Sequence, residues 1–450
     1  MKTFKKSALI ILLMATAAPA FALEVEFEED NRLPIVYINV AAKTGSVSDP
    51  QGKSGLTDFM GEMLLRGTKL RKKQQLDATL DQIGASLGVE TRAEAMILRG
   101  AVLAKNLDKF LELVAEVLTQ PSFDRVEMTK LRNQKRSSYK EELGNDRATA
   151  QKKFERYLFR NHPYGNPPEG NGKEFDKITL ADVQKHYDEI VRDQLLVIVG
   201  TGDASTSRIK EWGRKLAESR AGGQTRTAVP QPENLAQREL MIIDKPNRTQ
   251  TQIFGGWVGV RMTDPDYFAL YIGNHAFGGG SFLARLMQEI RVKKGWSYGA
   301  YSNFRHGTQP RSWMFNLFPA SKDAADALKL TLQLINELKE KGITEAEFNS
   351  AKQSLTNNAG FSYNTPKKRV ENILLERTLN LPHGFMKTYA ERMASVTLSQ
   401  VNAALKRFVQ PEHLFITVLG TEKGLREPLA NAAGIPAQSV KVVDFQSWPN

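Results

Sequence analysis

Residues 178–183 read Ile-Thr-Leu-Ala-Asp-Val, and residues 195–201 read Leu-Leu-Val-Ile-Val-Gly-Thr. Nearly the same pair returns at residues 396–401, Val-Thr-Leu-Ser-Gln-Val, and at residues 414–421, Leu-Phe-Ile-Thr-Val-Leu-Gly-Thr. In each copy a threonine stands where a helix N-cap is expected, and an apolar run typical of a buried strand follows the helix. The copies lie about 220 residues apart, which indicates that the chain contains two versions of one structural unit.

The beginnings of the two units also match. Residues 35–40 predict a strand that leads to Asp49-Pro50 and a helix, and residues 251–258 predict a strand that leads to Asp264-Pro265 and a helix. Landmarks that repeat in the same order at nearly one spacing are hard to obtain by chance.

Residues 219–238 separate the units. They are rich in glycine, proline and polar residues and show no periodicity, which is typical of a linker. We therefore predict an N-terminal domain at residues 23–218 and a C-terminal domain at residues 239–450. Both mix β-branched strands with amphipathic helices, which favours an α+β fold with helices packed on one side of each sheet.

Residues 1–22 have the pattern of a signal peptide. A lysine-rich start is followed by an apolar run at residues 8–18 and by the small-x-small site Ala20-Phe21-Ala22. We predict cleavage after Ala22 and a periplasmic location. The alternative is an uncleaved anchor, but the apolar run is short for a bilayer.

The overall composition excludes several classes of protein. With 450 residues, 41% hydrophobic and 25% charged, the chain is globular and long enough for two or three domains. The absence of cysteine excludes disulfides, thiolate catalysis and lipid attachment through an N-terminal cysteine. A formal charge of +12 could suit nucleic acid, but acidic residues are interleaved and no basic–aromatic stripe is present.

Several short motifs occur in order along the chain: Ser54-Gly-Leu56, Arg66-Gly-Thr68, Gly84-Ala-Ser-Leu-Gly88, Asn161-His-Pro-Tyr-Gly165 and the segment 278–301. Taken together, they resemble those of the M16 peptidases, the inverzincins related to pitrilysin and mitochondrial processing peptidase. The resemblance covers essentially the whole chain after the signal peptide and implies two homologous domains, each a mostly antiparallel sheet with helices on one side.

The zinc motif of that family is degenerate in this chain. The family carries His-x-x-Glu-His on one helix, because two imidazoles four residues apart reach one ion and the adjacent carboxylate activates its water. The resemblance places these three positions on Asp58, Gly61 and Glu62, and the third ligand on Glu142. No histidine precedes His162, so we predict no zinc site; carboxylate binding of Mg²⁺ or Ca²⁺ is the alternative.

The substrate-binding elements differ between the two halves. An asparagine that helps to hold peptide backbone in the family falls on Gly88. In the second half, Arg291 and Tyr298 match an arginine and a tyrosine, seven residues apart, that hold substrate in active members. Such residues can bind a peptide carbonyl or stabilise developing negative charge. The structural alternative is an arginine at a helix end and a tyrosine packed on a sheet edge.

Three further patterns are weaker. Residues 84–88 fit the Gly-x-Ser-x-Gly pattern, but a helix precedes Ser86 and an extended chain follows it, which reverses the order that a serine nucleophile needs. Gly278-Gly-Gly280 precedes a helix without the Lys-Ser/Thr of a phosphate loop, and we interpret it as a flexible or close-packed loop. The six histidines show no ligand spacing, and His162 is interpreted as structural.

The asymmetry between the halves leads to three functional hypotheses. The first is a non-catalytic subunit of an exported M16 heterodimer that supplies Arg291 and Tyr298, while zinc is held by the partner chain and peptides are the substrates. The second is a homodimeric peptide-binding or scaffold protein of the envelope. The third is a metallopeptidase with an unorthodox site.

Overall fold

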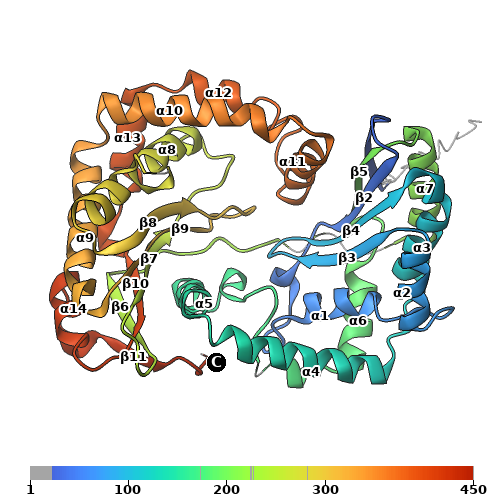
Figure 1. Ribbon diagram of the computed structural model, residues 1–450, viewed down its shortest axis with the longest axis horizontal. Coiled ribbons are helices and arrows are strands. Elements are labelled where there is room, and N and C mark those ends of the chain that lie inside the picture. The colour runs from blue at the N-terminus through green and yellow to red at the C-terminus, as the bar shows by residue number, and fades with distance from the viewer. Residues whose placement is uncertain (1–22, 173, 223–225, 227, 281, 449–450) are drawn as a thin grey trace, which may run out of the picture.

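The chain folds into two halves that lie side by side and are joined by a single crossing segment (Figure 1). The computed structural model describes residues 23–448 except 173, 223–225, 227 and 281. The signal peptide that the sequence predicts at residues 1–22 lies outside the described residues. In the described part of the chain, no helix is both long and apolar enough to cross a bilayer.

The first half is built on a five-stranded sheet with the order β1-β5-β2-β4-β3. Strands β1 and β5 pair in parallel, and the other neighbours pair antiparallel. The strands are β1 (Glu24–Glu29), β2 (Ile35–Ala42), β3 (Ser86–Thr91), β4 (Met96–Leu103) and β5 (Leu196–Gly202). The helices of this half are α1 (Leu56–Leu64), α2 (Lys73–Gln82), α3 (Leu107–Thr119), α4 (Arg125–Glu142), α5 (Asp146–Phe159), α6 (Leu180–Ile190) and α7 (Thr206–Ser219).

The second half repeats this plan with a six-stranded sheet of order β11-β6-β10-β7-β9-β8. Its strands are β6 (Glu239–Asp244), β7 (Gln252–Val258), β8 (Ser297–Phe304), β9 (Ser312–Pro319), β10 (Phe415–Gly420) and β11 (Lys441–Asp444). Its helices are α8 (Tyr267–Asn274), α9 (Ala324–Lys341), α10 (Glu345–Ala359), α11 (Pro366–Thr378), α12 (Tyr389–Ser395), α13 (Leu398–Phe408) and α14 (Arg426–Ala433). The predicted α+β architecture of two similar domains is therefore confirmed.

The repeated helix–strand segments form as the sequence predicts. Thr179 and Thr397 cap α6 and α13, and each takes part in a reciprocal capping box with the residue three positions later. These caps satisfy backbone N–H groups that have no partner inside the helix. The two apolar runs that follow become β5 and β10, and every residue in these strands is buried.

Side chains alternate between the two faces of β5, and both faces are apolar. Leu196 and Ile198 point into the core that the helices of the first half cover. Val197 and Val199 point to the opposite face, where they pack against Val370 and Leu374 in a separate cluster. The second face of this sheet therefore also needs an apolar cover.

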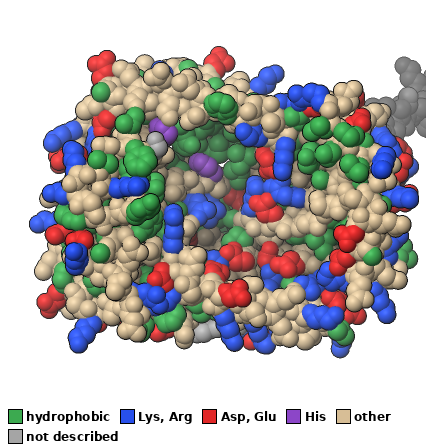
Figure 2. Space-filling model, viewed as in Figure 1, with side chains coloured by type: hydrophobic (Ala, Val, Ile, Leu, Met, Phe, Trp, Pro, Cys, Tyr) green, Lys and Arg blue, Asp and Glu red, His purple; other side chains and the backbone are tan. Residues whose placement is uncertain are grey.

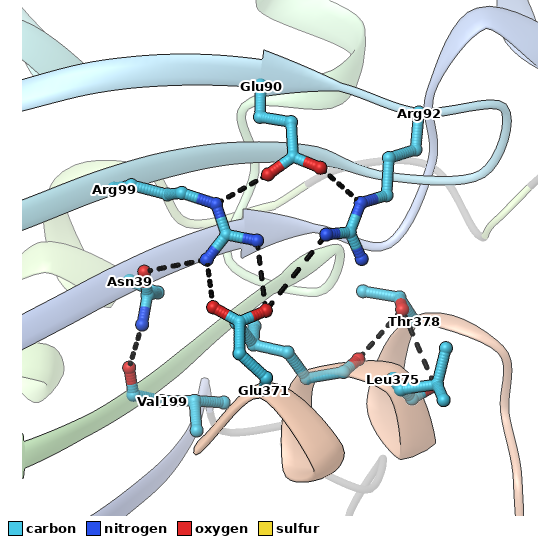
Figure 3. Close-up of polar contacts among 9 residues, drawn as sticks. Asn39, Glu90, Arg92, Arg99, Val199, Glu371, Leu375 and Thr378 are labelled. Carbon is cyan, nitrogen blue, oxygen red and sulfur yellow. Dashed lines mark hydrogen bonds and ion pairs between the residues drawn. The ribbon is translucent and has the colours of Figure 1, made fainter. Parts of the chain in front are cut away.

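Helix α11 of the second half provides that cover and lies across the sheet of the first half (Figure 1). Its polar side is fixed by ion pairs, and Figure 3 shows Glu371 of α11 between Arg99 and Arg92. The guanidinium of Arg99 donates to Glu371 at 2.5 Å and to Glu90 at 2.6 Å. Arg369 and Arg377 of the same helix bind carboxylates on β1.

Helix α5 of the first half makes the reciprocal contact with the sheet of the second half. Its Ala150, Phe154 and Leu158 join a buried cluster with residues of β6, β7 and β10. The ring of Phe154 stacks against Phe415, with a centroid distance of 6.0 Å. Each sheet is thus covered on one face by helices of its own half and on the other by a helix of the opposite half.

A buried glutamate joins two hairpin tips where the halves meet. The first tip is the β3–β4 turn and the second is the loop between β8 and β9. Glu94, in the β3–β4 turn, accepts hydrogen bonds from the backbone N–H of Thr308 at 2.8 Å and from the hydroxyl of Tyr164 at 2.5 Å. Arg226 supplies a charged partner at 2.7 Å. The carboxylate is 3% exposed, so its charge is compensated entirely by these neighbours.

We predict that Phe154→Ala lowers the free energy of unfolding by about 3 to 5 kcal/mol, because the cavity lies in the core that both halves share. Denaturant unfolding monitored by tryptophan fluorescence measures this change. The control is Phe361→Ala, since Phe361 is exposed. A loss for Phe154→Ala as small as that of the control would contradict the structural role assigned to α5.

We also predict an acid-sensitive contribution from His306, which follows β8 at the second hairpin tip. Burial and, to a smaller degree, the charges of Arg311 and Arg305 lower the pKa of His306 to about 4 from an ordinary value of 6.5. The folded state therefore keeps His306 neutral, and its contribution to stability is present above pH 6.5 and is lost as the pH falls toward 4. The expected loss between pH 7 and pH 4 is about 2 to 3 kcal/mol.

Denaturant unfolding at pH 7, 5.5 and 4 measures this dependence in the wild type and in His306→Gln. The variant is expected to lose less stability on acidification than the wild type. His383→Gln, at an exposed histidine, is the matched control. Equal pH dependence in all three proteins would rule out the role of His306.

Candidate functional site

Helix α1 carries two of the three degenerate zinc-ligand positions, Asp58 and Glu62, and also Gly61 at the base position. A buried polar cluster fixes the beginning of this helix. Asp49 accepts hydrogen bonds from the backbone N–H groups of Gly55 at 2.7 Å and Thr57 at 2.8 Å, and from the Thr57 hydroxyl at 2.6 Å. The Nε2 atom of His186 lies 2.8 Å from the same hydroxyl. The carboxylate, hydroxyl and imidazole resemble a nucleophile triad in composition, but Thr57 is completely buried and cannot meet a substrate.

Asp58 and Glu62 lie one turn apart on α1, and both bind a lysine. The Nζ atom of Lys135, on α4, is 2.5 Å from Asp58 and 2.8 Å from Glu62. Burial alone would lower the pKa of Lys135, but the two carboxylates outweigh it and the pKa is raised. Burial raises the pKa of Asp58, and Lys135 offsets that effect only partly. The side chains that would meet a metal ion are thus already paired with an ammonium group.

Glu142, the third degenerate position, has a lysine of its own. It lies at the end of α4 and pairs with Lys152 of α5 at 2.6 Å, and Lys152 also pairs with Glu169. Asp58, Glu62 and Glu142 do line one cavity of about 510 Å³, so the structure brings the three positions together as the resemblance implies. Within the described residues, however, no group of three or more His, Asp or Glu side chains is arranged to hold a metal.

Gly61 stands where the family has its general base, and the packing leaves no room for a side chain there. A Cβ at this position would lie 2.7 Å from a methyl carbon of Val89 and 3.0 Å from the sulfur of Met96. A side chain at position 61 would therefore require the side chains of Val89 and Met96 to shift. Gly88, by contrast, faces open space, so its lack of an asparagine does not result from crowding.

Zinc does not fit this site. The chain has carboxylates but no imidazole here, the base position is sterically closed, and lysines neutralise the remaining ligand positions. These two lysines were not found from the sequence. The sequence spacing could have identified Lys135 as a neighbour of the zinc positions. It lies seven residues before Glu142, two turns away on the same face of one helix.

The glycine triplet of the second half is tightly packed. A Cβ on Gly278 would meet the hydroxyl oxygen of Ser302 at 2.6 Å, and one on Gly279 would meet the side chain of Asn274 at 2.7 Å. The triplet closes the π-helix η5 (His275–Gly279), and a second π-helix, η6 (Met287–Lys293), follows. Of the two roles considered for the triplet, close packing is the one observed.

Arg291 lies in η6, and Tyr298 lies at the start of β8, an edge strand of its sheet. The two side chains are in contact, with the guanidinium carbon 4.5 Å from the centroid of the tyrosine ring. Phe282 approaches the same guanidinium at 4.7 Å. Tyr298 is 79% exposed, so the pair is presented on the surface rather than packed as a structural element.

The Arg291–Tyr298 pair lies outside the two cavities described for the region between the halves and for the degenerate zinc positions. A hollow of about 550 Å³ lies between the halves, and its walls are formed by the two hairpin tips, α5 and the end of α11. Figure 2 shows this central depression, with basic and histidine side chains around it. Among the described residues that line the hollow or the degenerate zinc cavity, neither Arg291 nor Tyr298 is found.

The remaining sequence patterns are structural. Helix α2 ends at Gln82 and β3 begins at Ser86, which confirms the helix–turn–strand order that argues against a serine nucleophile. His162 accepts a hydrogen bond from the backbone N–H of Tyr164, and its Nε2 atom lies 2.8 Å from the carbonyl of Pro230. These two contacts of His162 hold its loop in place.

Two family models match this chain. Residues 24–172 match the model described as insulinase (peptidase family M16), and residues 177–355 match the model described as peptidase M16 inactive domain. Together they span most of the sequence, so the chain belongs to peptidase family M16. The residues at its degenerate zinc site make it a non-catalytic member of that family.

Relatives are consistent with membership of the family, and a solved structure shares the fold. A Helicobacter pylori protein described as non-peptidase homolog YmxG is 23% identical over 435 residues, covering 94% of this chain and 99% of the relative. A Bacillus subtilis protein described as an uncharacterized zinc protease YmxG is 21% identical over 87% of this chain and 94% of the relative. A peptidase M16 inactive domain from Pseudomonas fluorescens superposes with a TM-score of 0.82 at 24% identity, covering 89% of this chain and 96% of that structure.

We predict that Lys135→Met lowers the free energy of unfolding by about 3 kcal/mol, because it leaves two partly buried carboxylates without their shared cation. Denaturant unfolding measures the loss. Lys130→Met, at an exposed lysine on the same helix, is the control. Adding Asp58→Asn and Glu62→Gln to Lys135→Met is expected to restore part of the stability, and a failure of Lys135→Met to exceed the control would contradict the ion-pair role.

Proposed function

We propose that this chain is the non-catalytic subunit of an exported heterodimeric M16 zinc peptidase. It supplies Arg291 and Tyr298 to a substrate that is bound at the zinc of a partner chain. One observation carries the proposal. Within the described residues, Tyr298 is exposed and Arg291, which is partly buried, has no ionic partner, whereas the zinc positions are paired with Lys135 and Lys152.

The chemistry of the pair suits a peptide. The guanidinium of Arg291 has five N–H donors in one plane, and the hydroxyl of Tyr298 adds another donor. A peptide carbonyl can accept from both, and the same donors would stabilise the negative charge that develops on that oxygen when it is attacked. No proton transfer is required of either residue.

The missing half of the chemistry requires a second chain. Zinc and its general base would belong to a partner with the His-x-x-Glu-His helix, and the two chains would close around an unfolded peptide. The signal peptide predicted at residues 1–22 supports a periplasmic location for this assembly. A homodimer that holds peptides without cleaving them is the second candidate, because the exposed pair needs no metal to bind a carbonyl.

We predict that Arg291→Ala lowers kcat/KM of the heterodimer about 100-fold, since one strong donor to the developing oxyanion is lost. Tyr298→Phe is expected to cause a smaller loss of about tenfold. The measurement is cleavage of a quenched fluorescent peptide by this chain co-expressed with a zinc-motif M16 chain. Arg407→Ala, at an exposed arginine, is the control.

Three outcomes would count against the trans role. The partner could cleave equally well alone, the Arg291→Ala complex could retain full activity, or the two chains could fail to associate. Size-exclusion chromatography of this chain with and without the partner tests association. A stable homodimer that ignores the zinc-motif chain would favour the peptide-binding or scaffold protein instead.

Metal titration tests the third hypothesis, an unorthodox metallopeptidase. Calorimetry of the purified chain with Zn²⁺, Mn²⁺ and Ca²⁺ is expected to show no stoichiometric tight binding, because lysines already neutralise the carboxylates. Peptide cleavage by the purified chain that is abolished by a chelator would overturn the non-catalytic assignment.

A further inference from the structure

The side chain of Arg291 is held by aromatic rings instead of a carboxylate. Its guanidinium carbon lies 4.7 Å from the ring centroid of Phe282 and 4.5 Å from that of Tyr298. In the part of the chain that the structure describes, no acidic side chain or carbonyl is paired with it. Contact with ring faces leaves the in-plane N–H groups available, so the arrangement orients Arg291 without consuming its donors.

Phe282 is itself tied to the helix that carries Arg291. The side-chain amide of Gln288, in η6, donates a hydrogen bond to the backbone carbonyl of Phe282. The ring nevertheless remains 54% exposed. Phe282 is therefore fixed relative to Arg291 and still available to a ligand.

Exposed apolar side chains are concentrated in the segment of sequence that carries this arginine. Of the ten large apolar side chains that are exposed in the described residues, four lie within the short segment 282–298. A cluster of this kind on an otherwise polar surface marks a binding site more often than chance exposure does. The four are Phe282, Leu283, Val292 and Tyr298.

The charges beside the cluster select the kind of ligand. Lys293 pairs with Glu289 at 2.6 Å, and the ammonium of Lys294 lies 5.3 Å from the centroid of the Trp296 ring. Glu289 is the only acidic residue in the sequence of segment 282–298, and it is already paired, so the segment is apolar and cationic. It suits a peptide segment with a bulky apolar side chain and disfavours one with a lysine or arginine at that point.

We propose that Phe282, Leu283 and Val292 form a subsite for a bulky apolar side chain of the peptide whose backbone carbonyl Arg291 binds, and that Phe282 also positions Arg291. The subsite rests on the proposed peptide-binding function and adds a specificity to it. The occupant is an unfolded peptide, and the partner subunit is the competing occupant that the experiment distinguishes.

The experiment measures binding of fluorescein-labelled Gly/Ser decapeptides that carry one central Phe, Leu, Ala or Lys. Fluorescence anisotropy with the wild-type chain is expected to show at least about tenfold tighter binding of the Phe peptide than of the Ala peptide, the gain expected for burying one such side chain. The Lys peptide is expected to bind no better than the Ala peptide.

The variants separate the two roles of the cluster. Phe282→Ala and Leu283→Ala are expected to abolish the preference for Phe, and Phe282→Leu to retain part of it. Arg291→Ala should weaken all peptides alike and leave the preference in place. Val126→Ala, at an equally exposed apolar residue outside the cluster, should change nothing.

Each outcome bears on a different claim. If the wild type binds all four peptides equally and Arg291→Ala weakens them, the subsite is wrong and the proposed function stands. If no peptide binds the wild type, both fail. If Phe282→Ala and Leu283→Ala leave peptide preference intact but prevent association with a zinc-motif chain in size-exclusion chromatography, the cluster is a subunit interface.

Discussion

Both sheets are apolar on both faces, and this constraint determines how the two halves are joined. Leu196 and Ile198 are buried under helices of the first half, while Val197 and Val199 point the other way and need α11 from the second half. Helix α5 of the first half likewise covers the open apolar face of the second sheet. Because neither sheet is fully covered by its own half, α5 and α11 bury the open sheet faces and pack the two domains tightly against each other.

This exchange limits what a single chain can do. The Arg291–Tyr298 pair belongs to one half and the degenerate zinc positions to the other, and neither Arg291 nor Tyr298 is among the described residues that line the two cavities. Moving one half toward the other would pull α5 or α11 from its apolar surface and break the buried contacts of Glu94. Under the proposed function, Arg291 and Tyr298 would therefore act on a substrate held by a second chain.

The sequence predicts the parts of the structure that depend on local chemistry. Thr179 and Thr397 identify helix starts through capping, and the apolar runs after them identify buried strands. The helix exchange could not be predicted, because periodicity shows that α11 has an apolar face but not which sheet it covers. Lys135 and Phe282 were missed for a related reason: their contacts with Asp58 and Arg291 depend on tertiary packing, and neither residue type is a ligand in the family motif.

The pairing of Lys135 explains how the fold tolerates the loss of zinc chemistry. Two carboxylates one turn apart on a partly buried helix face repel each other and are stabilised by a nearby cation. A metal ion can provide that charge together with a reactive water, whereas the ammonium of Lys135 provides the charge alone. Gly61 extends the argument, since a side chain at this position would require Val89 and Met96 to shift. The site is therefore satisfied as an ion pair, and restoring histidines without removing Lys135 would leave an ammonium group where the metal would bind.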